Sequence, residues 1–101
     1  MEYVYKAEVT INEDKALSDG VKLAGLYAAI DDCFKEDKIY KEVNDKLITY
    51  YTNDKEKNGM ISACVLSLYD SPMRPYLASL VWYNKLLDNV EDVLEVLKSE
   101  K

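Results

Sequence analysis

Apolar and polar residues alternate at the start of the chain, and this pattern constrains the fold more than any other feature. One side of residues 3–11 carries Tyr3, Tyr5, Ala7, Val9 and Ile11, and the other carries Val4, Lys6, Glu8 and Thr10. Successive side chains of a β-strand point to opposite faces of the sheet. The pattern therefore predicts a strand near a sheet edge, with one face against the core and one face in water.

Two helices are predicted, one early in the chain and one at its end. Ser18 is a favourable N-cap residue, and apolar residues recur at helical spacing from there to about Asp37. Near the C-terminus, Asp88 or Asn89 can cap a second amphipathic helix. The apolar positions are Leu23, Leu26, Tyr27, Ile30, Cys33 and Phe34 in the first helix and Val90, Val93, Leu94 and Leu97 in the second.

Three more strands are predicted, at Leu47–Thr52, Met60–Tyr69 and Tyr76–Asn84. Their β-branched and aromatic residues favour sheets, and Asn58-Gly59 is typical of a hairpin turn. The two prolines predict a stiff loop over residues 70–75, because each fixes its own φ angle. A helix over residues 77–87 is the alternative to the last strand, and residues 38–46 are expected to form a charged connection.

The order of these elements, β-α-β-β-β-α, predicts an α+β fold. We expect a two-layer sandwich in which two helices pack on a mainly antiparallel four-stranded sheet. Residues 1–101 should form a single domain, because this length is close to the usual domain size and 49% of the residues are hydrophobic.

The predicted hairpin around the two prolines is apolar on both of its faces. Two helices cover one face of a small sheet, and an uncovered face that carries aromatic residues is typical of an interaction site. We therefore expect a homo-oligomer or a partner complex, formed through Ile61, Val65, Tyr69, Tyr76, Leu80 and Trp82. Two alternatives stay open: each helix covers part of each face, or a register shift of one residue exchanges the faces.

Histidine is absent from the sequence. This removes the side chain used most often for general acid–base catalysis and for zinc ligation near neutral pH. The three glycines stand apart, so they form no phosphate-binding loop, and the adjacent carboxylates of Asp31 and Asp32 do not converge on a metal ion if they lie on a helix. The sequence predicts a protein that is not an enzyme and needs no cofactor or metal.

Acidic residues outnumber basic ones by 19 to 13, which gives a formal net charge of −6. This charge opposes direct binding to nucleic acid or to an anionic membrane, so a basic protein partner is expected. The acids expected to steer that partner are Asp31, Asp32, Glu36, Glu91, Asp92 and Glu95.

Arg74 is the one arginine of the chain, and it lies in the predicted proline loop. A guanidinium group on a stiff loop can bind a carboxylate or a phosphate through two parallel hydrogen bonds. The alternative is an ion pair with Asp70 that closes the loop.

The N-terminus lacks the basic and long apolar regions of a signal peptide, and the longest uncharged runs are too short for a membrane helix. We therefore expect a cytoplasmic protein. Cys33 and Cys64 have no metal-binding or redox spacing and are expected to be reduced, buried thiols.

The leading functional hypothesis is a small acidic binding protein without enzymatic activity. Tyrosine and tryptophan supply rigid contact area, and acids steer a basic partner. Such a protein would act as an inhibitor, immunity or anti-defence-type antagonist, with nucleic-acid mimicry as one route. The alternative is a small-ligand sensor or sponge, in which tyrosines stack a nucleotide base and Arg74, together with lysines, holds phosphate in a pocket between protomers.

Overall fold

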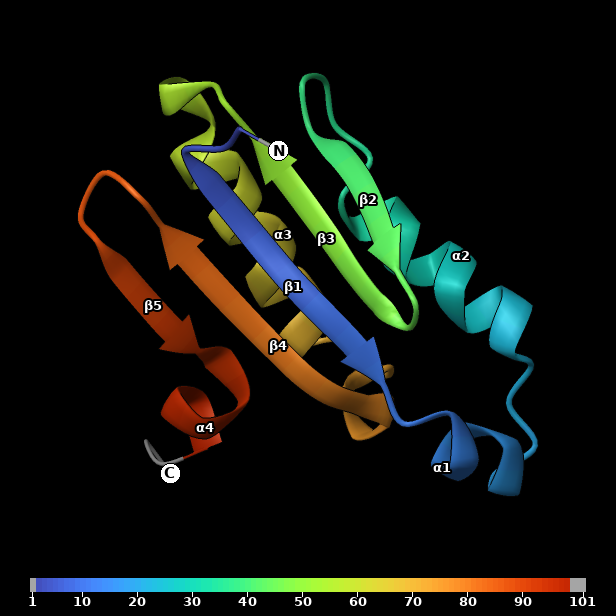
Figure 1. Ribbon diagram of the computed structural model, residues 1–101. Coiled ribbons are helices and arrows are strands. Elements are labelled where there is room, and N and C mark those ends of the chain that lie inside the picture. Colours follow the sequence, from blue (N-terminus) through green and yellow to red (C-terminus); the bar gives the residue numbers. More distant parts are fainter. Residues whose placement is uncertain (1, 99–101) are drawn as a thin grey trace.

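A five-stranded antiparallel sheet forms one layer of the protein, and helices form the other. The computed structural model describes residues 2–98, and their side chains as far as residue 96. The strands are β1 (Tyr5–Ile11), β2 (Tyr40–Asn44), β3 (Leu47–Thr52), β4 (Leu77–Asn84) and β5 (Asn89–Asp92), in the spatial order β2-β3-β1-β4-β5 (Figure 1). The predicted α+β class and antiparallel sheet are therefore confirmed, with five strands in place of four.

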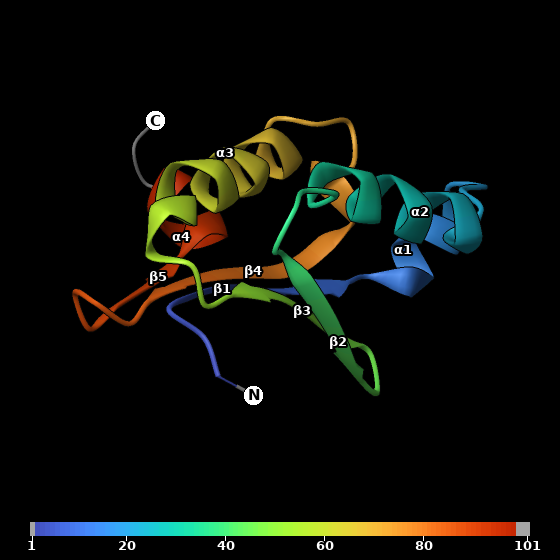
Figure 2. The same cartoon turned by 90° about the horizontal axis from the view of Figure 1, so that it is seen from above.

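Among the described residues, two main helices and two short ones accompany the sheet. They are α1 (Glu13–Ser18), α2 (Leu23–Cys33), α3 (Asn58–Tyr69) and α4 (Val93–Lys98), with 3₁₀ turns at Lys55–Lys57 and Arg74–Tyr76. Figure 2 shows α2, α3 and α4 on one side of the sheet, and the segment before β1 on the other side. No helix among residues 2–98 combines the length and the apolar character that crossing a bilayer requires.

The core lies between the sheet and these helices. The odd-numbered residues of β1 point into it, as the alternation predicted, and Ala7 and Val9 are completely buried. Ile61 and Leu68 of α3 and Ile30 of α2 close the core from above. Two ring stacks brace it, Tyr5 on Trp82 and Phe34 on Tyr50, with ring centroids 5.8 and 4.1 Å apart.

The predicted position of β1 near a sheet edge is wrong, because β1 is the central strand. It pairs with β3 along one side and with β4 along the other. Its even-numbered residues are polar because no helix in the described part of the chain covers their face of the sheet, not because the strand lies at an edge.

The predicted strand over Met60–Tyr69 is also wrong, because this segment forms most of α3. The residues of α3 that are buried recur at the spacing of a helix: Ile61, Cys64, Val65, Leu68 and Tyr69. Apolar residues at the intervening positions hide this period in the sequence. Asn58-Gly59 therefore begins a helix and does not form a hairpin turn.

The charged connection predicted over residues 38–46 contains the edge strand β2. All five of its residues are exposed, so no burial pattern marks it in the sequence. Pairing with β3 forms the strand, and the two-residue turn Asp45-Lys46 joins the pair. Asp45 has φ 58°, as the first central residue of such a tight hairpin turn requires.

Both predicted helices begin later than expected. Ser18 is the last residue of α1 and not an N-cap, and Asn12 caps α1 by accepting a hydrogen bond from the Lys15 amide (3.1 Å). Asn89 begins β5, a four-residue strand that pairs with β4. The tail helix α4 follows it, and its Glu95 amide donates to the Asp92 carboxylate (3.4 Å). The strand predicted up to Asn84 is confirmed against the helical alternative over 77–87.

The two thiols should differ in reactivity. Cys64 is buried and Cys33 is half-buried, and burial raises the pKa of both groups. The prediction of shielded thiols therefore fits Cys64 better. We expect a thiol reagent to label Cys33 in the native protein and Cys64 only in denaturant, so that Cys33→Ser removes the native labelling. Labelling of both thiols at one rate without denaturant would contradict this difference.

Candidate interaction face

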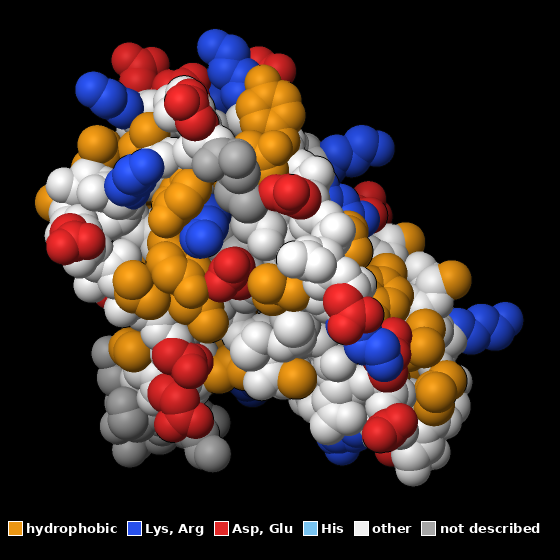
Figure 3. All heavy atoms as spheres, in the orientation of Figure 1, with side chains coloured by type: hydrophobic (Ala, Val, Ile, Leu, Met, Phe, Trp, Pro, Cys, Tyr) orange, Lys and Arg blue, Asp and Glu red, His pale blue; other side chains and the backbone are white. Residues whose placement is uncertain are grey.

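No helix of residues 2–98 covers one face of the sheet, and we call the side-chain layer on that face the open face. Figure 3 views it directly and shows hydrophobic side chains gathered in patches, with basic and acidic groups between them. The even-numbered residues of β1 lie on it, because its odd-numbered ones fill the core. Two cross-strand rows carry its aromatic and acidic residues, and Tyr3 adjoins them. The open face also holds Asn44 opposite Leu47 and Thr10 opposite Ser79.

The first row is aromatic and crosses all five strands. Directly opposed residues on neighbouring strands give the order Tyr40, Tyr51, Lys6, Tyr83 and Val90. Neighbouring strands lie about 4.8 Å apart, so the side chains of this row are in reach of each other. The row brings together tyrosines that are far apart in the sequence.

Lys6 lies in the middle of this row and contacts the aromatic rings beside it. Its ammonium group lies 4.4 Å from the centroid of the Tyr83 ring and 4.6 Å from that of Tyr3. Lys85 lies 5.2 Å from the Tyr3 centroid. Tyr3 is therefore on the open face, although the alternation placed it with Tyr5. The chain bends between them at Val4, which is buried.

The second row is acidic and runs beside the first. Its order from β2 to β5 is Glu42, Thr49, Glu8, Val81 and Asp92. Carboxylates therefore stand on alternate strands, next to the tyrosines. Glu8 forms an ion pair with Lys6 (3.6 Å). Hydrogen bonding to the Glu8 carboxylate, together with burial, raises the pKa of Tyr83 to about 12. The phenol of Tyr83 is thus neutral at physiological pH.

The predicted partner or dimer face does not exist as a surface of this protein. Ile61, Val65, Tyr69, Leu80 and Trp82 are each 9% exposed or less. They meet in the core, because Met60–Tyr69 is a helix that packs on the sheet and is not a strand of it. The surface through which a homo-oligomer was predicted is therefore buried, and nothing else in residues 2–98 indicates a homo-oligomer.

The remaining residue of that predicted face, Tyr76, is half-buried, and its hydroxyl donates to Asp19 (3.0 Å). Arg74 is exposed, and its guanidinium lies 4.8 Å from the centroid of the Tyr69 ring. No ion pair joins Arg74 to Asp70 within residues 2–98, so cation–π stacking takes the place of the predicted loop-closing pair.

The six predicted steering acids do not form one patch. Asp92 lies on the open face, whereas its neighbour Glu91 points to the helical side of the sheet. Asp32 and Glu36 are exposed on and after α2, and Glu95 is exposed on α4. Asp31 is engaged within the protein, as described next. The acids that accompany the aromatic row are Glu8, Glu42 and Asp92.

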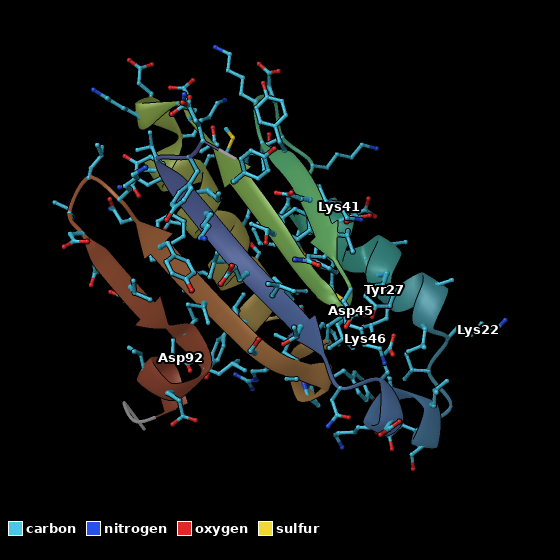
Figure 4. All side chains as sticks on the ribbon, viewed as in Figure 1. Lys22, Tyr27, Lys41, Asp45, Lys46 and Asp92 are labelled. Atoms are coloured by element: carbon cyan, nitrogen blue, oxygen red, sulfur yellow. The ribbon has the colours of Figure 1, made fainter. Side chains whose placement is uncertain are left out.

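Two similar groups of a carboxylate, a tyrosine and a lysine attach the helices to the β2–β3 hairpin. Asp31 accepts hydrogen bonds from Tyr50 (2.6 Å) and Lys41 (3.0 Å). Glu13 accepts one from Tyr27 (2.7 Å) and forms an ion pair with Lys46 (2.7 Å). Figure 4 shows Tyr27, Lys41 and Lys46 together beside α2 and the hairpin. The Asp31 group positions α2, and the Glu13 group positions α1 and α2. Each carboxylate finds its partners within the protein.

Acid should weaken the Asp31 group. Burial acts to raise the pKa of Asp31, but the hydrogen bonds from Tyr50 and Lys41 outweigh it, so the folded-state pKa is lowered. The stability that this carboxylate adds is present above its unfolded pKa and is lost as pH falls through the folded one. We expect Asp31→Asn to reduce stability at pH 7, and the difference from the unsubstituted protein to shrink below about pH 4. Urea denaturation at pH 7, 5 and 3 measures it, and a constant difference would contradict the prediction.

A cleft of about 370 Å³ lies on the helical side of the sheet, between α3, β4, β5 and α4. Val65, Leu66 and Trp82 give it an apolar floor, and Asn84 and Glu91 add polar groups. Its described lining contains no lysine or arginine. The cleft therefore does not suit a nucleotide phosphate.

The sequence contained part of the signal for the open face. The alternation over residues 3–11 placed Lys6 and Glu8 on the wet side. The strand predicted over Leu47–Thr52 also implies that the adjacent Tyr50 and Tyr51 point to opposite faces of the sheet. The structure confirms both, with Tyr50 buried and Tyr51 on the open face. Tyr40 and Glu42 were missed, because the strand that carries them was not predicted.

Comparisons of this chain with protein-family models, with curated proteins and with solved structures find no match. Within residues 2–98, no three histidine, cysteine, aspartate or glutamate side chains are grouped so that they could hold a metal ion. The open face is therefore the feature of this protein that bears on its function.

Proposed function

We propose that this protein binds a basic macromolecular partner on its open face and acts as an inhibitor, immunity or anti-defence-type antagonist of that partner, without catalysis of its own. The observation that carries the proposal is the pairing of the two rows. Four tyrosine rings and two valines lie next to three carboxylates on one uncovered sheet face.

Two properties of this arrangement support partner binding. Aromatic side chains carry a large share of binding energy at protein interfaces and lose little conformational entropy. The net charge of −6 attracts a basic surface, and the acidic row places carboxylates beside the contact area. The stacked rings of Tyr5 and Trp82 lie in the core beneath the face and support the sheet from behind.

The nucleotide sensor is the weaker alternative. The tyrosine rings would suit a base, but a phosphate needs free cations. Lys6 is paired with Glu8 and lies over two rings, and Lys85 lies over the Tyr3 ring at the margin of the face. Arg74 stacks on Tyr69 of α3, which covers the opposite face of the sheet. Acidic groups on the open face would also repel a phosphate.

Affinity capture from the source organism, followed by binding measurements with the purified partner, tests this proposal. We expect Tyr51→Ala to weaken the affinity about tenfold, as for an aromatic residue near the centre of an interface. Leu66→Ala, which removes an exposed side chain from α3 on the helical side, is the matched control and should leave the affinity unchanged. Urea denaturation of both variants verifies that each is folded. A partner that binds Tyr51→Ala as tightly as the unsubstituted protein would refute the open face as the binding surface.

A further inference from the structure

The tyrosine rings of the open face differ in whether a cation already lies over them. The ammonium group of Lys6 lies over the rings of Tyr3 and Tyr83, and that of Lys85 also lies over the Tyr3 ring. Within the described part of the chain, no lysine or arginine lies over Tyr40 or Tyr51. Tyrosine faces attract cations, and the protein satisfies this attraction at one end of the aromatic row only.

Tyr40 and Tyr51 form a paired aromatic surface at the other end. They are directly opposite each other on β2 and β3, and their ring centroids are 5.8 Å apart with planes inclined by 42°. Tyr40 is 55% exposed, so one ring of the pair is open to a partner. Its neighbour Tyr51 is half-buried and held between β2 and the central strand β1.

An unpaired carboxylate adjoins these rings. Glu42 lies two residues after Tyr40 on the same face of β2, about 7 Å along the strand. Glu42 is exposed and forms no ion pair within residues 2–98. In contrast, Glu8, the other carboxylate next to Tyr51, is neutralised by Lys6. The two rings without a cation, Tyr40 and Tyr51, therefore lie next to the carboxylate without an ion pair, Glu42.

A guanidinium group matches both features. It is planar, stacks on an aromatic ring, and offers N–H donors at its edge to a carboxylate, whereas an ammonium group is a compact, strongly hydrated point charge. The protein itself contains an example of such stacking, since the Arg74 guanidinium carbon lies 4.8 Å from the centroid of the Tyr69 ring. A nucleobase would also stack on the rings, and Lys38 and Lys55 line a hollow beside Tyr40. Lys38 is paired with Asp54 (3.7 Å), however, and Glu42 would repel phosphates at the rings.

We infer that Tyr40, Tyr51 and Glu42 form a subsite for an arginine side chain of the basic partner. This inference rests on the function proposed above, because it names the group of the partner that one end of the open face receives. The guanidinium would stack on the exposed Tyr40 ring and donate hydrogen bonds to Glu42.

NMR titration at low salt tests the subsite with a hexa-arginine peptide. We expect the peptide to shift the ring resonances of Tyr40 and Tyr51, and a hexa-citrulline peptide, which is neutral but nearly isosteric, to shift neither. Glu42→Gln should weaken hexa-arginine binding about threefold to fivefold, which is the loss expected for an exposed charged partner. Glu91→Gln is the matched control, because it removes the same charge from an exposed residue on the helical side of β5.

Three outcomes would overturn the inference. Equal weakening by Glu42→Gln and Glu91→Gln would show attraction by net charge alone. Equal affinity for hexa-arginine and hexalysine would show that the subsite attracts any cation and does not select a guanidinium group. Stronger shifts of Tyr40 and Tyr51 by a hexauridine oligonucleotide would show that the rings receive bases.

Failure of the subsite and failure of the proposed function give different results. If the captured partner depends on Tyr51 but hexa-arginine does not bind at Tyr40, the open face remains the binding surface and only the arginine subsite is wrong. If the captured partner is indifferent to Tyr51→Ala, the proposed function itself is wrong.

Discussion

Leu68→Ala should lower the free energy of unfolding by about 2–5 kcal/mol, whereas Leu66→Ala should change it by less than about 1 kcal/mol. Leu68 is completely buried between α3 and the sheet, and Leu66, two residues earlier, is 47% exposed. Truncating the buried leucine removes its transfer free energy and leaves a cavity. Since a domain of this size is stabilised by about 5–15 kcal/mol, the loss is a large share of the total.

This pair of variants distinguishes a helix from a strand. Residues two apart point to opposite sides of a helix but to the same face of a strand. A strand over Met60–Tyr69 would place Leu66 and Leu68 on one face and make the two substitutions similar in cost. Urea denaturation of both variants, with the slope of the transition checked for constancy, measures the difference. Similar losses would contradict α3.

The same segment shows why sequence reasoning failed there. The core residues Ile61, Cys64, Val65 and Leu68 have helical spacing, and this signal was available in the sequence. Apolar side chains also stand at positions that turn away from the core, such as Leu66, so the segment shows no clear period. Leucine, alanine and methionine favour helices over strands, and Met60–Tyr69 contains four of them. When a segment shows no clear period, this composition indicates a helix better than the period does.

Prediction succeeded where the pattern within one element decides the structure. The alternation of β1 follows from its burial on one face only, and it correctly separated Ala7 and Val9 from Lys6 and Glu8. β2 has no such pattern, because both of its faces are exposed at the edge of the sheet. Its formation depends on pairing with β3, which is an interaction between elements.

The open face depends on register and could not be derived from the chain alone. Lys6 meets Tyr51 on one side and Tyr83 on the other only because β1 pairs with both β3 and β4. A shift of one residue in either pairing would send these tyrosines into the helical layer. The surplus of acids and tyrosines was evident from composition, but their alignment in adjoining rows is a property of the folded sheet.

The acids of the open face should control the rate at which a basic partner associates. Replacing Glu8, Glu42 and Asp92 by their amides removes the acidic row, and we expect the association rate at low salt to fall roughly 10- to 100-fold. Electrostatic steering raises association rates by such factors, and it is screened beyond about 10 Å at 0.1 M ionic strength. The triple variant should therefore also lose most of the salt dependence of association.

The matched control removes Asp32, Glu36 and Glu95 in the same way. Both triple variants have the same net charge, but the control acids are exposed on or beside helices on the other side of the sheet. If steering depends on the acidic row, the control should slow association only about twofold to threefold, because its charges lie farther from the contact surface. Stopped-flow measurements over a range of salt concentrations compare the two. Equal slowing would mean that net charge alone attracts the partner, and the acidic row would then have no particular part in recognition.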